Sequence, residues 1–150
     1  MKLTIELVPQ NSWFTNLRSI LSKSEWDKIR KEQYQKSNYI CDICGGRGDR
    51  WPVECHEIWE YDDKKYTQKL IAFTSLCPSC HMVKHIGLAG IRGLHGEAIS
   101  HLMKINNMTR NEAEMYVEDQ MFKWQERSNH EWEIDISLVK IPEQCKQLAL

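Results

Sequence analysis

Two Cys-x-x-Cys pairs constrain this sequence more than any other feature. Cys41 and Cys44 form the first pair, Cys77 and Cys80 form the second, and 32 residues lie between the pairs. Four thiolates in two closely spaced pairs are the ligand set that a tetrahedral zinc ion requires. Two glycines follow the first pair in CDICGG, and glycine lets the backbone amides approach the sulfurs closely. We therefore predict one structural Zn²⁺ site that joins the two pairs.

The rest of the chain favours reduced thiols. The N-terminal sequence MKLTIELVPQ has no apolar signal segment, which favours a cytoplasmic location, where disulfides are disfavoured. No run approaches the roughly 18 apolar residues that a membrane helix needs, so we expect no membrane partner. Cys55 and Cys145 stand alone, and a lone cysteine is more often a small buried hydrophobe than a ligand.

Net charge excludes one class of nucleic-acid protein. The 150 residues contain 20 Lys and Arg against 21 Asp and Glu, so this is not a strongly basic chain held to DNA by neutralising phosphates. The charge is uneven, at +3 over residues 1–40, 0 over 41–92 and −4 over 93–150. A surface for a polyanion is therefore expected in the first two thirds. The acidic last third suits contact with a protein partner.

Apolar patterning predicts an α+β protein of one domain. Strands are predicted over 3–8, 51–59, 70–76 and 130–139, and a polar loop over 60–69. Helices are predicted over 12–21, 24–37, 77–85, 96–106 and 108–128, with a glycine-rich connection over 87–96. Thr109 and Glu112 have the spacing of a capping box at the start of the last helix. The order strand, loop, strand, helix therefore lies between and around the cysteine pairs.

Three histidines fall within this unit. His81 and His85 are four residues apart on the predicted helix, so both imidazoles lie on one face, and His56 lies on the first of the two central strands. We predict that the three imidazoles share one metal ion, as a three-ligand site with an open position for a phosphate oxygen. A structural interpretation stays open, in which His81 supports the zinc site and His85 places a cation near a helix end. Glu57 and Cys55 flank His56 and point to the other strand face unless a bulge intervenes.

These residues carry a resemblance to a known family. The segments EWDKIRKEQYQKSNYICDICG, VECHEIWEYDD and LCPSCHMVKHIG, within residues 25–87, resemble an HNH endonuclease. The resemblance implies a ββα-metal core with a four-cysteine zinc knuckle over 38–90 and a helical C-terminal extension over 91–150. It also implies a bacterial or phage enzyme that hydrolyses phosphodiester bonds in DNA with a divalent metal: Mg²⁺, Mn²⁺, Ni²⁺ or Zn²⁺. The oligomeric state stays open.

The resemblance leaves two alignments open. In one, His56 is a metal ligand and Glu57 replaces the histidine base of the family. In the other, His56 is the base and Cys55 occupies the ligand position, where a thiolate suits Zn²⁺ better than Mg²⁺. His81 matches the final histidine of the family motif, and His85 matches an extra histidine ligand of some members. His56, Glu57 and His81 are therefore the candidate catalytic residues.

One position departs from the family pattern. The middle Asn or His of the family falls near Ala72, where the sequence reads LIAFTS, and Gln68 is the nearest side chain that could orient the base. An alternative function is thus a catalytically degenerate HNH-fold zinc protein that binds nucleic acid or protein without cutting. Trp51 and Trp59 flank the motif and form either a recognition surface or the cover of the zinc site. Predicted contacts to DNA phosphates are Arg47, Arg50, Lys64, Lys65, Lys69 and Lys84.

Overall fold

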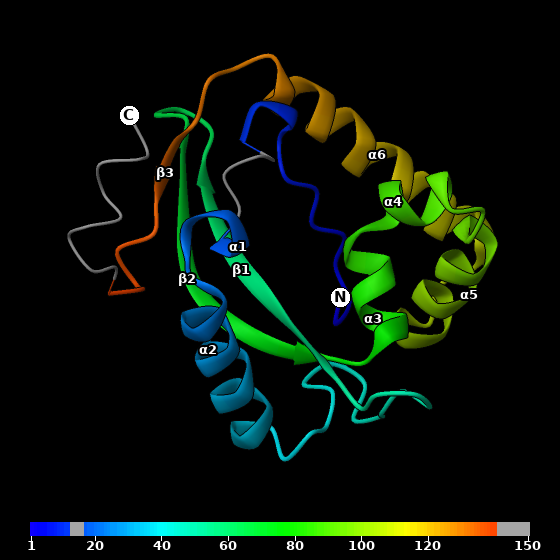
Figure 1. The fold of residues 1–150 in the computed structure, drawn as a ribbon. Helices are drawn as coiled ribbons and strands as arrows, with labels where there is room; N and C mark the ends of the chain where they lie inside the picture. The colour runs from blue at the N-terminus through cyan, green and yellow to red at the C-terminus, as the bar shows by residue number, and fades with distance from the viewer. Residues whose placement is uncertain (13–16, 141–150) are drawn as a thin grey trace.

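The computed structural model of the chain describes residues 1–12 and 17–140. Within them lies a small sheet in the order β1–β2–β3, with helices on either side of a long hairpin (Figure 1). The mixed α+β class predicted from the sequence is therefore confirmed. None of the helices in the described ranges has the length and apolar content needed to cross a bilayer.

The hairpin is the longest element of the sheet. β1 (Glu54–Asp62) pairs with β2 (Thr67–Leu76) in antiparallel fashion, with a register shift between Ile58 and Trp59. β3 (Glu133–Asp135) pairs in parallel with the far edge of β2. β1 therefore keeps one free edge, and the predicted loop at 60–69 shrinks to a turn because both strands extend into it.

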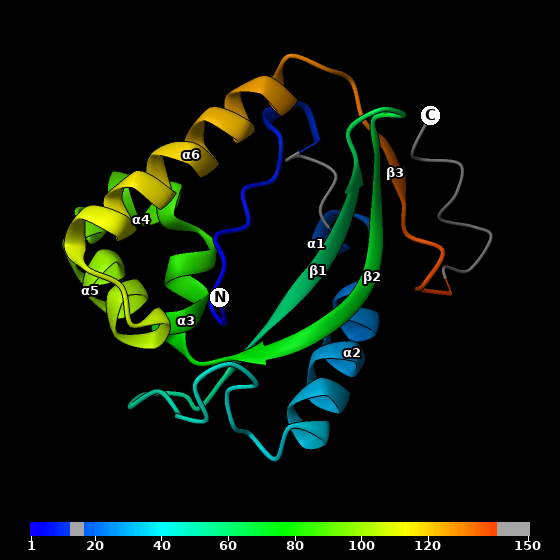
Figure 2. The same cartoon turned by 180° about the vertical axis from the view of Figure 1, so that it is seen from behind.

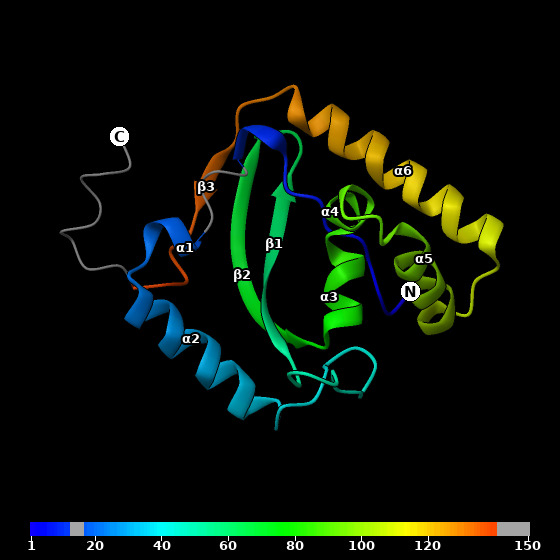
Figure 3. The ribbon, with the colours of Figure 1, turned by 45° about the vertical axis from the view of Figure 1, so that its right-hand side comes forward.

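Helices from the first part of the chain cover one face of the hairpin. After η1 (Gln10–Ser12) and α1 (Leu17–Ile20), α2 (Lys23–Lys36) crosses β1 and β2 (Figures 1 and 3). Ser22 caps α2 in a reciprocal capping box with Glu25, so the helix begins one residue before the predicted range of 24–37. The predicted helix over 12–21 falls partly on residues 13–16, outside the described residues.

The remaining helices gather beside β1, as the view from behind shows (Figure 2). They are α3 (Pro78–Lys84), α4 (Ile86–Ile91), α5 (His95–Asn106) and α6 (Arg110–Ser128). The capping box of Thr109 and Glu112 at the start of α6 is confirmed. The stretch 87–96 was expected to be a connection, but its first part is α4, because Ile86 and Ala89 bury their side chains in the main core. That burial offsets the helix-weakening effect of the glycines.

The N-terminal segment corrects a second expectation. Residues 3–8 are extended but form no strand. The amide of Leu3 donates to the Asn106 side chain, that of Ile5 to the Tyr116 hydroxyl, and that of Glu6 to the Lys84 carbonyl. The alternation of apolar and polar residues thus indicates one buried side, with Leu3 and Ile5 in the main core. Groups on helices α3, α5 and α6 accept the backbone hydrogen bonds that a neighbouring strand would otherwise accept. The last predicted strand, over 130–139, is also shorter, since only β3 is regular.

Candidate metal centres

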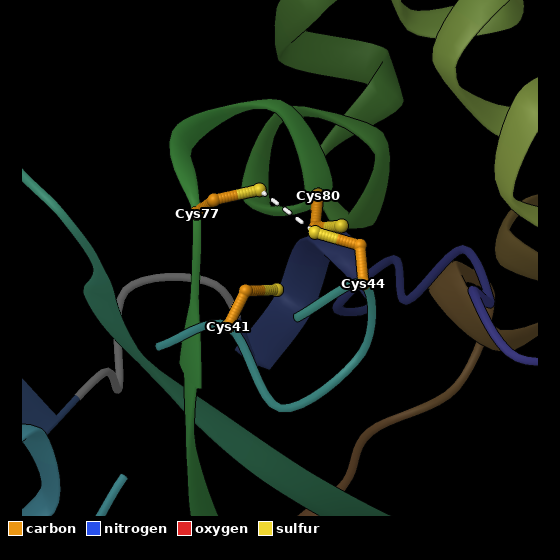
Figure 4. A group of neighbouring side chains, drawn as sticks. All are labelled: Cys41, Cys44, Cys77 and Cys80. Carbon is orange, nitrogen blue, oxygen red and sulfur yellow. Dashed lines mark hydrogen bonds between the residues drawn. The ribbon is translucent and has the colours of Figure 1, made fainter. Parts of the chain in front are cut away.

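The four paired cysteines form one cluster. Cys41 and Cys44 come from the loop before β1, and Cys77 and Cys80 come from the start of α3, because the hairpin returns the chain to its starting point (Figure 4). Their sulfurs lie within 4.8 Å of one another, and those of Cys44 and Cys77 are 3.6 Å apart. A tetrahedral zinc ion with Zn–S bonds of about 2.3 Å spaces its sulfurs by roughly 3.8 Å. The cluster therefore fits a metal such as zinc.

Backbone conformation and hydrogen bonds fix the loop that carries Cys41 and Cys44. Gly45 has a φ of +71°, which favours glycine, and the amide of Gly46 donates to the Cys44 sulfur at 3.3 Å. The Asp42 carboxylate accepts from the Thr74 hydroxyl and the Ser75 amide, each at 2.8 Å. These bonds attach the loop to the end of β2 and hold its cysteines opposite the other pair.

A fifth side chain reaches this cluster from α5. The Nε2 atom of His101 lies 3.2 Å from the sulfur of Cys80. A hydrogen bond from Cys80 lowers the pKa of Cys41 to about 4, while that same contact and burial raise the pKa of Cys80 well above its usual range. Neighbouring thiolates repel one another, so a dication and a donating imidazole both stabilise the ionised cluster.

The three histidines form a second cluster, which shares α3 with the cysteine cluster. Nε2 of His81 lies 3.2 Å from Nε2 of His85, and one ring nitrogen from each of the three side chains lies within 4.8 Å of the others. The His56 ring centroid is 5.2 Å from that of His81 and 5.1 Å from that of His85. The structure therefore brings together all three residues predicted to share a metal.

Carboxylates orient two of these imidazoles. Nδ1 of His81 lies 2.6 Å from a Glu54 oxygen, and Nε2 of His56 lies 2.9 Å from a Glu6 oxygen. When each of these nitrogens carries the proton, the other nitrogen of its ring is left as a lone-pair donor. For His56 that second nitrogen is Nδ1, which is buried and has no hydrogen-bond partner. An unpartnered buried nitrogen beside two further imidazoles fits a divalent metal.

The charges around the cluster keep its ligands in the right protonation states. Burial first raises the pKa of Glu6, but hydrogen bonds and charge from His56 and Lys84 lower it to about 2. The hydrogen bond from His81 lowers the pKa of Glu54. Burial is the main cause that lowers the pKa of His85, and the charges of His81 and His56 lower it further, to about 3. At neutral pH the carboxylates are therefore ionised and His85 is neutral, as a metal ligand must be.

A cleft of about 600 Å³ opens beside this cluster. It is lined by residues of three kinds: His81 and His85 of the cluster, the acidic residues Glu54 and Glu57, and the basic residues Arg18 and Arg92. Trp51, Met82, Leu88 and Leu94 supply apolar surface to the same cleft. The cleft thus combines two residues of the histidine cluster with two acidic and two basic residues.

Glu57 lies at the cleft although the side chains of a strand alternate between its two faces. Strand alternation places Glu57 on the face opposite His56, yet both Glu54 and Glu57 of the edge strand β1 line the cleft. Cys55 is buried instead, away from the histidine cluster, and burial together with the charge of Glu57 raises its pKa to about 12. Cys55 is not among the side chains whose ligand atoms come together with His81 and His85, whereas His56 is, which favours the alignment in which His56 is a ligand.

Other predicted site residues lie elsewhere. Gln68 is buried in β2 opposite Tyr61, six residues along the strand from Thr74, which pairs with His56. At about 3.3 Å per residue this separation is roughly 20 Å, so Gln68 does not orient a base at the histidine cluster. Cys145 lies outside the described residues.

The predicted phosphate contacts do not form one surface. Arg47 and Arg50 are exposed in the loop before Trp51, near the cleft. Lys64 and Lys65 are exposed in the hairpin turn, and Lys69 is exposed on β2 opposite Asp135 of β3. Lys84 is only 5% exposed and donates to Thr4 and Glu6. The prediction for Lys84 is therefore wrong: its ammonium group neutralises Glu6 and does not face solvent.

Sequence reasoning missed five residues that the structure places at these centres. Glu6, Glu54 and His101 bond to candidate ligands, and Arg18 and Arg92 line the cleft. Glu6, Glu54 and His101 are 21 to 50 residues away from the side chains that they contact, and no local spacing marks them. Comparison with protein-family models, with curated proteins and with solved structures finds no match for this chain.

Proposed function

We propose that this protein is a metal-dependent nuclease of the HNH type, which hydrolyses phosphodiester bonds in DNA. The observation that carries the proposal is the buried, unpartnered Nδ1 of His56 beside the imidazoles of His81 and His85. Two carboxylates orient this set, and it borders a cleft large enough for a nucleotide. The four-cysteine cluster serves as a structural zinc site that holds α3 against the loop before β1.

His56, His81 and His85 would hold the catalytic metal. Three neutral imidazoles suit Zn²⁺, Ni²⁺ or Mn²⁺ better than Mg²⁺, which prefers oxygen ligands. A divalent ion at such a site polarises a phosphoryl oxygen and stabilises the charge on the leaving oxygen. Arg18 and Arg92 add positive charge in the same cleft, which favours a phosphodiester over a neutral substrate.

Glu57 is the residue that we assign as general base. Its carboxylate lines the cleft with His81 and His85, where it can accept a proton from a water molecule that attacks phosphorus. His56 is less suited to that role, because it is 3% exposed and one of its nitrogens already bonds to Glu6. The geometry therefore supports Glu57 in place of the histidine base of the family.

A plasmid-nicking assay with Mg²⁺, Mn²⁺, Ni²⁺ or Zn²⁺ tests the proposal. We expect the wild type to cut with at least one of these metals and His56→Ala and His81→Ala to lose at least 100-fold in rate. Glu57→Gln should lose about 100-fold or more, the usual contribution of a general base. Equal cutting by all variants would indicate a contaminating nuclease, and full activity of Glu57→Gln would return the base role to His56.

One observation favours a second candidate function, a binding module that does not cut. The β2 residue paired with His56 is Thr74, and its hydroxyl donates a hydrogen bond to the Asp42 carboxylate. No Asn or His lies near Ala72 to orient a base. Binding of DNA without cutting in the presence of any of the four metals would support this function over the nuclease.

A further inference from the structure

We infer that the indole of Trp51 is a stacking platform for an unpaired nucleobase, so that the substrate of the proposed nuclease is a single-stranded nucleic acid or a single-stranded segment. This inference rests on the proposed function and adds a substrate class to it. Three features support it: the exposure of Trp51, the bonds that hold its side chain, and the other residues in the cleft.

Trp51 is more exposed than the other tryptophans that the structure describes. It is 47% exposed, whereas Trp26, Trp59, Trp124 and Trp132 of the described residues are all partly covered. An exposed indole leaves a large apolar surface in water, and aromatic side chains with one apolar and one polar end are typical of binding sites. The exposed ring lies at the cleft that contains the histidine cluster.

Trp51 is also held in place. Its Nε1 donates to one oxygen of Glu54 at 3.1 Å, while the other oxygen of Glu54 bonds to His81 at 2.6 Å. The turn that carries Trp51 is closed by a hydrogen bond from the Gly48 amide to the Pro52 carbonyl at 2.9 Å. A Cβ atom at Gly48 would lie 2.4 Å from the Trp51 carbonyl oxygen and 2.6 Å from Pro78. The indole is therefore linked to His81 through the Glu54 carboxylate, and the turn that carries it is closely packed against Pro78.

The cleft contains what a nucleotide with a free base requires. Arg18 and Arg92 can bind phosphate. Trp51, Leu88 and Leu94 form an apolar wall, which neither phosphate nor ribose requires for binding. An intact duplex presents its backbone to such a site and keeps its bases stacked and paired. An unpaired base next to the scissile phosphate can instead lie against the indole, and such stacking does not depend on base identity.

Fluorescence anisotropy with short labelled oligonucleotides tests the inference on the full chain without added divalent metal. The probes are single-stranded DNA, single-stranded RNA of the same sequence, and the DNA duplex. We expect the single strands to bind more tightly than the duplex and Trp51→Ala to weaken their binding by roughly 5- to 150-fold. Trp51→Phe keeps a ring but loses the bond to Glu54, and it should retain most of the affinity. Phe122→Ala is the matched control, because Phe122 is an aromatic residue on α6, 65% exposed and outside the cleft.

The outcomes separate the inference from the proposed function. If the wild type cuts DNA but Trp51→Ala binds and cuts single strands as the wild type does, the inference fails and the nuclease stands. If no metal supports cutting but Trp51 governs single-strand binding, the nuclease fails and the stacking site stands. Equal losses in Trp51→Phe and Trp51→Ala would show that the side chain acts only by holding Glu54, which overturns the inference. Preference for DNA or RNA identifies the sugar of the substrate.

Discussion

Glu6 and His56 are 50 residues apart in sequence, and their side chains meet at 2.9 Å between Oε2 and Nε2. The second oxygen of Glu6 accepts from the buried ammonium group of Lys84 on α3. This contact joins the N-terminal segment, β1 and α3 at one point. When Nε2 carries the proton that faces the carboxylate, Nδ1 of His56 keeps its lone pair and is the nitrogen left to bind a metal.

Replacing Glu6 should weaken metal binding at the histidine cluster. We expect Glu6→Ala to reduce Ni²⁺ or Zn²⁺ affinity by about 10- to 100-fold, since it removes the group that fixes the tautomer of His56. Isothermal titration calorimetry of protein that retains its structural zinc measures this change. Glu32→Ala, which removes an exposed carboxylate on α2, should leave the affinity unchanged. Wild-type affinity in Glu6→Ala would contradict a role for Glu6 in orienting His56.

The same carboxylate should make stability depend on pH. Because its pKa falls from 4.5 to about 2 on folding, ionised Glu6 contributes stability that is fully present above pH 4.5 and is lost as the pH falls toward 2. The contribution is on the order of 2 kcal/mol. We expect urea unfolding to give a difference between the wild type and Glu6→Gln that is constant from pH 7 to 5 and shrinks at lower pH. A difference that grows on acidification would contradict this assignment.

The parts of the two centres that could be predicted from the sequence are those set by local spacing. Local backbone geometry points the two cysteines of a Cys-x-x-Cys pair in one direction, and it does the same for two histidines four apart on a helix. A hairpin then brings the end of β2 back to the start of β1. Glu6 and His101 could not be found this way, because the packing of distant segments brings them to the ligands. The alternation at 3–8 indicated which side chains are buried, but not that helices rather than a strand would accept its backbone bonds. The glycines of 87–96 disfavour a helix locally, and only the burial of Ile86 and Ala89 stabilises α4.

Removing one ligand of the four-cysteine cluster should release zinc and unfold its surroundings. Structural zinc contributes about 10 to 16 kcal/mol in small metal-binding units, which exceeds the stability of many domains. We expect elemental analysis to find one zinc fewer per chain in Cys80→Ala, with a large fall in Tm. Cys55→Ala is the matched control, since Cys55 is equally buried but lies outside the cluster, and it should keep its zinc. Full zinc content in Cys80→Ala would remove Cys80 from the ligand set.

His101 should slow zinc loss without being required for folding. Its Nε2 lies 3.2 Å from the Cys80 sulfur, and a donor to a ligating thiolate typically changes metal affinity by about 10- to 100-fold. We expect His101→Ala to transfer zinc to a competing chelator faster than the wild type, with far-UV circular dichroism unchanged. His95→Ala, on the exposed start of the same helix, should match the wild type. Identical transfer rates for all three proteins would show that the contact does not act on the metal.

The salt dependence of oligonucleotide binding should separate the cleft cations from those of the hairpin turn. Arg18 and Arg92 line the cleft, whereas Lys64 is eight residues along the hairpin from His56, roughly 26 Å at about 3.3 Å per residue. Each phosphate contact adds about −0.7 to the slope of log affinity against log salt for a single strand. With an oligonucleotide too short to span the hairpin, Arg18→Ala and Arg92→Ala should each make the slope less negative by about 0.7. Lys64→Ala should leave it unchanged, and a smaller slope in that variant alone would place the bound strand at the hairpin turn, away from the histidines.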